Sequence, residues 1–108
     1  MQEFGLEVIK FVVSLPKGRT KEIIARQLTR SATSVGANYR AACRAKSLAD
    51  FISKMGTVEE EADESMYWME LIVESGMVKS ETLHYLITEA DELTALTVSS
   101  INTAKKNR

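Results

Sequence analysis

Apolar residues recur every three to four positions along four separate stretches of the chain, and this spacing predicts four helices. We expect the helices over about residues 3–15, 20–45, 47–75 and 80–103. Strict alternation of apolar and polar residues, which is typical of half-buried strands, is not sustained anywhere. Because four helices with short connections favour antiparallel neighbours, the pattern predicts one all-α domain over residues 1–108, an up-down-up-down four-helix bundle.

Polar residues and glycines at the helix ends predict where each helix starts and stops. Hydroxyl side chains are expected to cap three helices at their N-termini, namely Thr20, Ser47 and Ser80. Asp50, three residues after the second of these, completes a capping box with aspartate in place of the usual glutamate. Gly76 is expected near the C-terminal cap of the third helix. Weak helix formers after Val98 predict that the fourth helix frays at its end.

Two of the predicted helices carry more apolar surface than one core face requires. The first is apolar on a second face, which is made of Leu6, Ile9 and Val13. On the third, Trp68, Leu71 and Ile72 point away from the main core face. Either the third helix touches two neighbours, or this second patch is buried between subunits. We favour self-association, with Trp68, Leu71 and Ile72 at the interface of a homo-oligomer.

Four arginines gather on one face of the second predicted helix. At about 100° per residue, Arg26, Arg30, Arg40 and Arg44 fall within roughly an 80° stripe opposite the apolar face. Three interpretations stay open: ion pairs with acidic residues, a solvated face, or contacts with nucleic-acid phosphates along about 27 Å of helix. No aromatic residue lies among the arginines, because Tyr39 is expected on the core side, and this weakens the case for stacking on single-stranded bases.

The net charge of −1 conceals an uneven distribution of charge along the chain. Residues 17–54 carry nine Lys/Arg and two acids, whereas residues 59–92 carry eleven Asp/Glu and one lysine. Such asymmetry is found in nucleic-acid-binding surfaces and also where a basic helix lies beside an acidic one. We favour the paired helices and keep both interpretations.

Residues that support catalysis or bind metals are few. His84 is the only histidine, and no second ligand lies at the spacing that binds metals in helical bundles. Cys43, the only cysteine, is expected to be a small packing residue, and a single thiol suits the reducing cytoplasm. Because the chain has no run of about 18 apolar residues and no typical signal segment, we expect no contact with a membrane.

The acidic run at residues 59–64 is a candidate metal or acid–base site. Around a helix its carboxylates fan out in most directions, so they do not converge on one ion. Glu59 is the exception near the core face, where Ser31 and Asn38 could donate hydrogen bonds to it. We predict no catalytic residue, no metal and no cofactor, and therefore no enzyme.

Several stretches together carry a resemblance to a known family. They are residues 27–40, which read QLTRSATSVGANYR, residues 47–54, which read SLADFISK, and the shorter runs 60–65 and 67–71. They resemble the small bacterial four helix bundle protein family, also called 23S rRNA-intervening sequence or S23-type proteins, over nearly the whole chain. The resemblance implies an antiparallel four-helix bundle that assembles as a homopentamer and has no established catalytic residues.

Within that family, some relatives are encoded in intervening sequences of ribosomal RNA genes. A distant relative, the accessory protein of diversity-generating retroelements, is a basic pentamer that binds nucleic acid and a reverse transcriptase. In this chain Ala41 and Lys46 stand where relatives usually have glutamate, which makes the end of the second helix more basic. The leading hypothesis is a non-enzymatic, homo-oligomeric scaffold that binds RNA or DNA through the four arginines. The alternative is an adaptor that binds a protein partner through the acidic helices or through Trp68 and its neighbours.

Overall fold

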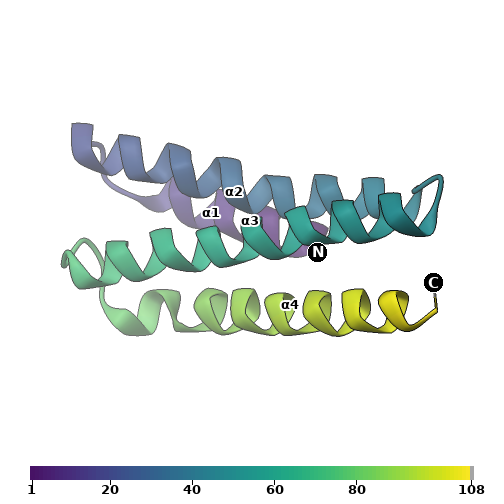
Figure 1. Ribbon diagram of the computed structural model, residues 1–108. Helices are drawn as coiled ribbons and strands as arrows, with labels where there is room; N and C mark the ends of the chain where they lie inside the picture. The colour runs from purple at the N-terminus through teal and green to yellow at the C-terminus, as the bar shows by residue number, and fades with distance from the viewer. Residues whose placement is uncertain (108) are drawn as a thin grey trace.

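The computed structural model describes residues 1–107 and confirms the all-α four-helix bundle (Figure 1). The helices are α1 (Gln2–Ser14), α2 (Arg19–Cys43), α3 (Leu48–Glu74) and α4 (Ser80–Lys106), within three residues of the predicted bounds. Contacts join α1 with α2, α2 with α3, α3 with α4, and, over a short stretch, α4 with α1. The described residues contain no strand, and none of their helices combines the length and hydrophobicity needed to cross a membrane.

The first helix is much shorter than the others. α1 has 13 residues and α4 has 27, so at 1.5 Å per residue they are about 20 and 40 Å long. The start of α1 lies against Gly36 of α2, where an added Cβ would be 3.5 Å from the Cα of Gln2. The last two turns of α2 therefore extend beyond α1, whose N-terminus lies midway along the bundle (Figure 1). One half of the molecule has four helices and the other half has three.

Apolar residues at helical spacing form one core along the bundle. The largest fully buried apolar side chains come from all four helices, namely Phe4, Leu28, Met55, Met69, Ile72 and Leu83. Burial of a side chain of this size contributes about 1.5–3 kcal/mol. Between α2 and α3, the buried Ser65 hydroxyl donates to Ser31 Oγ at 3.0 Å, and Ser31 donates to the carbonyl of Leu28 at 3.1 Å. This chain of hydrogen bonds lets two polar residues lie in the core.

The predicted signals at the two ends of α3 are confirmed. The backbone N–H of Asp50 donates to the Ser47 hydroxyl at 3.0 Å, as in a capping box. The Asp50 carboxylate accepts from the N–H of Lys46 at 3.1 Å, one residue earlier than in the usual box. At the other end Gly76 has φ +81°, and the N–H of Met77 donates to the carbonyl of Ile72 at 3.3 Å. This is the Schellman arrangement, in which a glycine takes the left-handed position.

Three other predictions about helix ends were wrong. Thr20 does not cap α2 and Ser80 does not cap α4, because each helix starts earlier and leaves its hydroxyl residue inside the first turn. The cap positions belong to Gly18 and Lys79, and neither makes a side-chain cap hydrogen bond. The fourth helix does not end at residue 103, since the buried Ala104 holds its last turn on the bundle.

Candidate nucleic-acid interface

The four arginines of the predicted stripe all lie on the surface, but they differ in what they contact. α2 buries Leu28 and Val35, which directs the opposite face outward. Arg30 reaches α3 and pairs with two carboxylates there, at 3.2 Å from Glu61 and in direct contact with Glu64. For Arg30 the interpretation as an intramolecular ion pair therefore holds. Within residues 1–107 the other three arginines make no ion pair.

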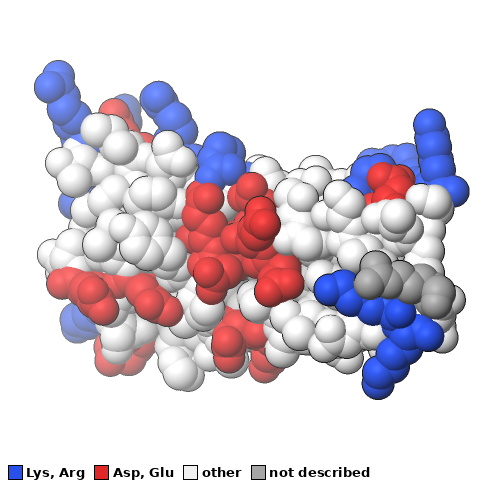
Figure 2. Space-filling view, viewed as in Figure 1, with Lys and Arg blue, Asp and Glu red and all other residues white. Residues whose placement is uncertain are grey.

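The contacts of Arg30 extend into a small network between α2 and α3. The hydrogen bond that Arg30 donates to Glu64, followed by the charges of both carboxylates, raises the pKa of Arg30 above its usual value. Glu64 also accepts a hydrogen bond from Trp68 Nε1 at 3.0 Å. A large group of acidic side chains lies midway along the face shown in Figure 2, with basic side chains toward both ends. A phosphate backbone that followed the whole of α2 would therefore meet acidic groups at its centre.

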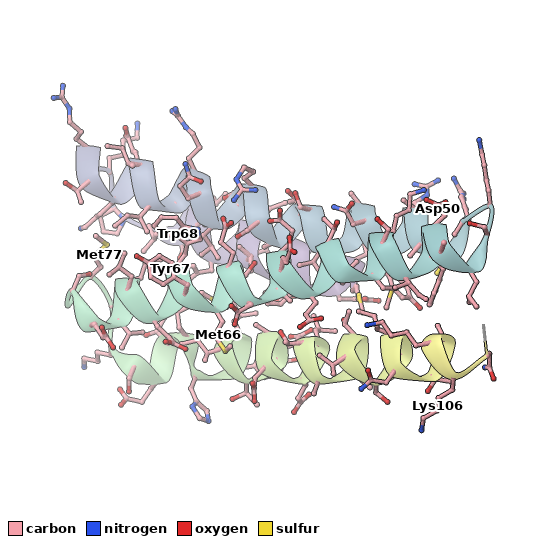
Figure 3. All side chains as sticks on the ribbon, viewed as in Figure 1. Asp50, Met66, Tyr67, Trp68, Met77 and Lys106 are labelled. Atoms are coloured by element: carbon pink, nitrogen blue, oxygen red, sulfur yellow. The ribbon has the colours of Figure 1, made fainter. Side chains whose placement is uncertain are left out.

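Exposed basic side chains lie at one end of the bundle. α2 and α4 both run toward this end, so the end of α2, the connection to α3 and the end of α4 all lie there (Figure 1). Their exposed cationic residues are Arg40, Arg44, Lys46, Lys105 and Lys106. Figure 3 shows Lys106 and Asp50 at this end and Trp68 toward the other. We call these five residues the basic end.

The basic end contains little negative charge. Asp50 is the only acid within residues 38–54 and 98–107. Its carboxylate accepts hydrogen bonds from Lys54 Nζ at 2.9 and 2.8 Å. Hydrogen bonds from Lys54 and then from the Lys46 N–H lower the pKa of Asp50. Asp50 is therefore ionised at neutral pH and already paired, so it does not offset the charge of the five exposed cations.

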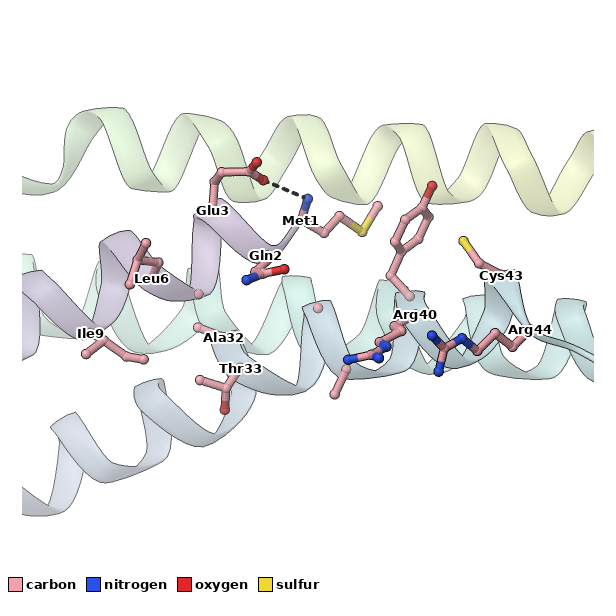
Figure 4. Close-up of a pocket in the computed structure, with 14 residues that line it drawn as sticks. Met1, Gln2, Glu3, Leu6, Ile9, Ala32, Thr33, Arg40, Cys43 and Arg44 are labelled. Carbon is pink, nitrogen blue, oxygen red and sulfur yellow. Dashed lines mark hydrogen bonds and ion pairs between the residues drawn. The ribbon is translucent and has the colours of Figure 1, made fainter.

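A pocket of about 670 Å³ opens beside the basic end, where α1 stops and α2 continues (Figure 4). Its walls include Gln2 and Leu6 of α1, and Tyr39, Arg40 and Arg44 from α2 and its C-terminal cap. Tyr39 was predicted to lie on the core side, but 38% of this residue is exposed. The reason is that the N-terminus of α1 lies against Gly36, so α1 does not extend far enough along α2 to cover the ring.

The same geometry corrects the expectation for Cys43. This residue was expected to pack, yet it is exposed and lines the pocket. In Figure 4 it projects from the last turn of α2, beyond the N-terminus of α1. The neighbouring Cys43 thiol, through a hydrogen bond, raises the pKa of the Tyr39 hydroxyl. Tyr39 therefore stays neutral and keeps its O–H donor at physiological pH.

The predicted interface of Trp68, Leu71 and Ile72 does not form one exposed patch. Ile72 is only 1% exposed, and Trp68 and Leu71 are half-buried. The reason is that α3 contacts both α2 and α4, so the alternative of a helix with two neighbours accounts for Ile72. A surface around Trp68 that binds a protein partner would therefore not include Ile72, which is buried. The apolar face of α1, in contrast, is exposed, and Val13 reaches 79%.

The proposed partners of Glu59 have other contacts. Ser31 pairs with Ser65 in the core, and Asn38 donates to the carbonyl of Ser34 in its own helix at 2.8 Å. His84 is exposed on α4. Among residues 1–107, no three His, Cys, Asp or Glu side chains gather where they could hold a metal ion.

Sequence reasoning missed two components of this site. One is Tyr39, and the other is the pair Lys105 and Lys106, which the antiparallel topology places at the end of the bundle where α2 ends. The signal for the lysines was available, because the second and fourth helices end at the same end of any up-down-up-down bundle. The exposure of Tyr39 depends on where α1 begins along α2.

Comparison with known proteins finds a family and solved structures that match most of the chain. A family described as 23S rRNA-intervening sequence protein matches residues 1–99. A solved structure from Bacteroides thetaiotaomicron, described as a protein with unknown function from the S23 ribosomal protein family, is 32% identical. The alignment covers 92% of each chain, with a TM-score of 0.86. No curated protein matches this chain.

Proposed function

The chain belongs to the 23S rRNA-intervening sequence protein family, and we propose that it is a non-enzymatic scaffold that binds nucleic acid at its basic end. The observation that carries this proposal is that five exposed cations lie at one end of the bundle, where residues 38–54 and 98–107 contain a single acid that is already paired. Such a cluster attracts phosphates because each neutralised phosphate releases a condensed counterion. The interface proposed here keeps Arg40 and Arg44 from the predicted stripe. It omits Arg30, which is paired with α3, and Arg26, which lies toward the opposite end.

The kind of charge also favours phosphate as the ligand. Arg40 and Arg44 present planar guanidinium groups that can donate two parallel hydrogen bonds to one phosphate. Lys46, Lys105 and Lys106 add point charges around them. Because the net charge of the protein is −1, long-range attraction is weak, and binding depends on this local field. Affinity should therefore fall steeply as salt screens the basic end.

The experiment is a titration of a fluorescein-labelled single-stranded RNA of about 12 nucleotides, followed by anisotropy at roughly 50 to 200 mM salt. The test variant is Arg40→Gln/Arg44→Gln, and the control is Arg19→Gln/Arg26→Gln. Both remove two exposed arginines, at opposite ends of the bundle. The test variant should reduce the salt slope by about 1.4, since each single-strand phosphate contributes about 0.7. The control should leave the slope unchanged. Absence of binding at low salt, or equal effects of the two variants, would contradict the proposal.

Self-association is the second part of the proposal, and the apolar outer face of α1 supports it. Leu6, Ile9 and Val13 lie at helical spacing and are exposed, which is unusual for a soluble chain without a partner surface. The family resemblance sets five copies of the 12.0 kDa chain as the expected assembly. In sedimentation velocity, Val13→Glu should shift the protein toward the monomer. The control Tyr85→Glu, at a residue that is 70% exposed on α4, should not. A wild-type monomer at micromolar concentration would refute this part.

A further inference from the structure

The end of α2 carries an exposed aromatic ring at the same pocket as two arginines. Tyr39 is 38% exposed, whereas Val35, one turn earlier on the same side, is completely buried. Arg40 is its neighbour in sequence, and Arg44 follows one turn later. All three line the pocket of about 670 Å³, together with Gln2 and Leu6. The pocket thus combines an accessible ring, two guanidinium groups, a side-chain amide and apolar surface, together with the Glu3 carboxylate, which is paired with the N-terminal ammonium at 3.4 Å.

We propose that this pocket binds one base of a single-stranded nucleic acid, with the base stacked on Tyr39 and the adjoining phosphates held by Arg40 and Arg44. The inference rests on the proposed function and makes the ligand more specific. Stacking of a base on an aromatic side chain contributes about 1–3 kcal/mol and tolerates every base, since each has a π-face. The side chain of Gln2 offers donors and an acceptor to the edge of the base.

The size of the pocket is consistent with this ligand. Pockets of about 300–1,000 Å³ hold small molecules, and a single nucleotide falls well inside that range. Arg40 and Arg44 are four residues apart on one helical face, so their Cβ atoms lie about 5–6 Å from each other. Two guanidinium groups at this separation can contact neighbouring phosphates while the base between them enters the pocket.

The distribution of charge disfavours a duplex. A paired base could reach Tyr39 only after it left the stack, at a cost of a few kcal/mol. A rigid duplex along α2 would also run from the basic end onto Glu61 and Glu64, which are occupied by Arg30 and belong to the acidic run at residues 59–64. A flexible single strand avoids both problems, because it can turn at the end of the bundle. The geometry therefore favours single-stranded over double-stranded nucleic acid.

The test compares three fluorescein-labelled probes of about 12 nucleotides: a mixed-sequence single-stranded RNA, an abasic oligonucleotide with the same number of phosphates, and the RNA duplex. Wild-type protein should bind the single-stranded RNA roughly 5- to 150-fold more tightly than the abasic probe, which is the range that one stacked base predicts. Tyr39→Leu should abolish that difference, because it keeps an apolar side chain and removes the ring. Tyr39→Phe should preserve it. Tyr85→Leu is the matched control on an exposed tyrosine of α4 and should have no effect.

The outcomes separate this inference from the proposed function. If wild-type protein binds both single-stranded probes equally and Arg40→Gln/Arg44→Gln still weakens binding, the basic end binds phosphates and stacking on Tyr39 is refuted. If no probe binds at low salt, both proposals fall. Tighter binding of the duplex than of the single strand would also overturn the inference. If Tyr39→Leu does not fold, the comparison of the RNA with the abasic probe on wild-type protein decides by itself.

Discussion

Two glycines of the second half of the chain should respond in opposite ways to the same substitution. Gly56 lies inside α3 and Gly76 follows its end, and an added Cβ would meet nothing within 4 Å at either position. Steric clash therefore contributes to neither change, and only the backbone conformation differs. Gly76 has φ +81°, where an L-residue is destabilised by about 1–2 kcal/mol. Gly56 is helical, and alanine is favoured over glycine in a helix interior by about 0.8–1.0 kcal/mol.

Gly56→Ala should accordingly raise the free energy of unfolding by about 1 kcal/mol, and Gly76→Ala should lower it by about 1–2 kcal/mol. Urea unfolding followed by circular dichroism measures both, at one protein concentration because assembly would add to stability. The slope m should stay constant, so that the shift in midpoint reports stability alone. If Gly76→Ala is neutral, the Schellman end of α3 does not hold a left-handed residue in solution. If Gly56→Ala destabilises the protein, Gly56 packs against another molecule and not against residues of its own chain.

Three further predictions concern the core and the end of α2. Ile72→Ala should lower the free energy of unfolding by about 2–5 kcal/mol, because Ile72 is only 1% exposed. A much smaller loss in urea unfolding would indicate that the Ile72 side chain lies on the surface. Ser31→Ala and Ser65→Ala should be non-additive, with a coupling of about 0.5–1.5 kcal/mol in a double-mutant cycle, since their hydroxyls share one buried hydrogen bond. The pKa of Asp50 is lower in the folded protein than in the unfolded chain, where it is near 3.8. Pairing with Lys54 therefore stabilises the fold fully above pH 3.8, and this stabilisation is lost as the pH falls through the pKa of Asp50 in the folded protein. The midpoint difference between wild type and Asp50→Asn should therefore be present at pH 6 and vanish in strong acid, and a constant difference would refute the pairing.

The position of Ile72 illustrates where periodicity stops being informative. Its sequence pattern is the same for a helix with two neighbours in one chain and for a helix that meets a second subunit. Contacts of α3 with both α2 and α4 decide for the first. Arg30 is a similar case, because its place on the outer side of α2 was predicted correctly. Its ion pairs with Glu61 and Glu64 depend on how far around α2 the neighbouring helix lies.

The sequence by itself determined the number of helices, their bounds to within three residues and most of the residues that face the core. These features depend on side chains within one or two turns of each other, so local spacing is enough to predict them. Only the tertiary structure decided which outward-facing residues are covered. The start of α1 opposite Gly36 leaves Tyr39 open, and the antiparallel order places Lys105 and Lys106 at the end of the bundle where α2 ends. Both follow from helix lengths and from which helices are adjacent, and those are set by packing between residues far apart in the chain.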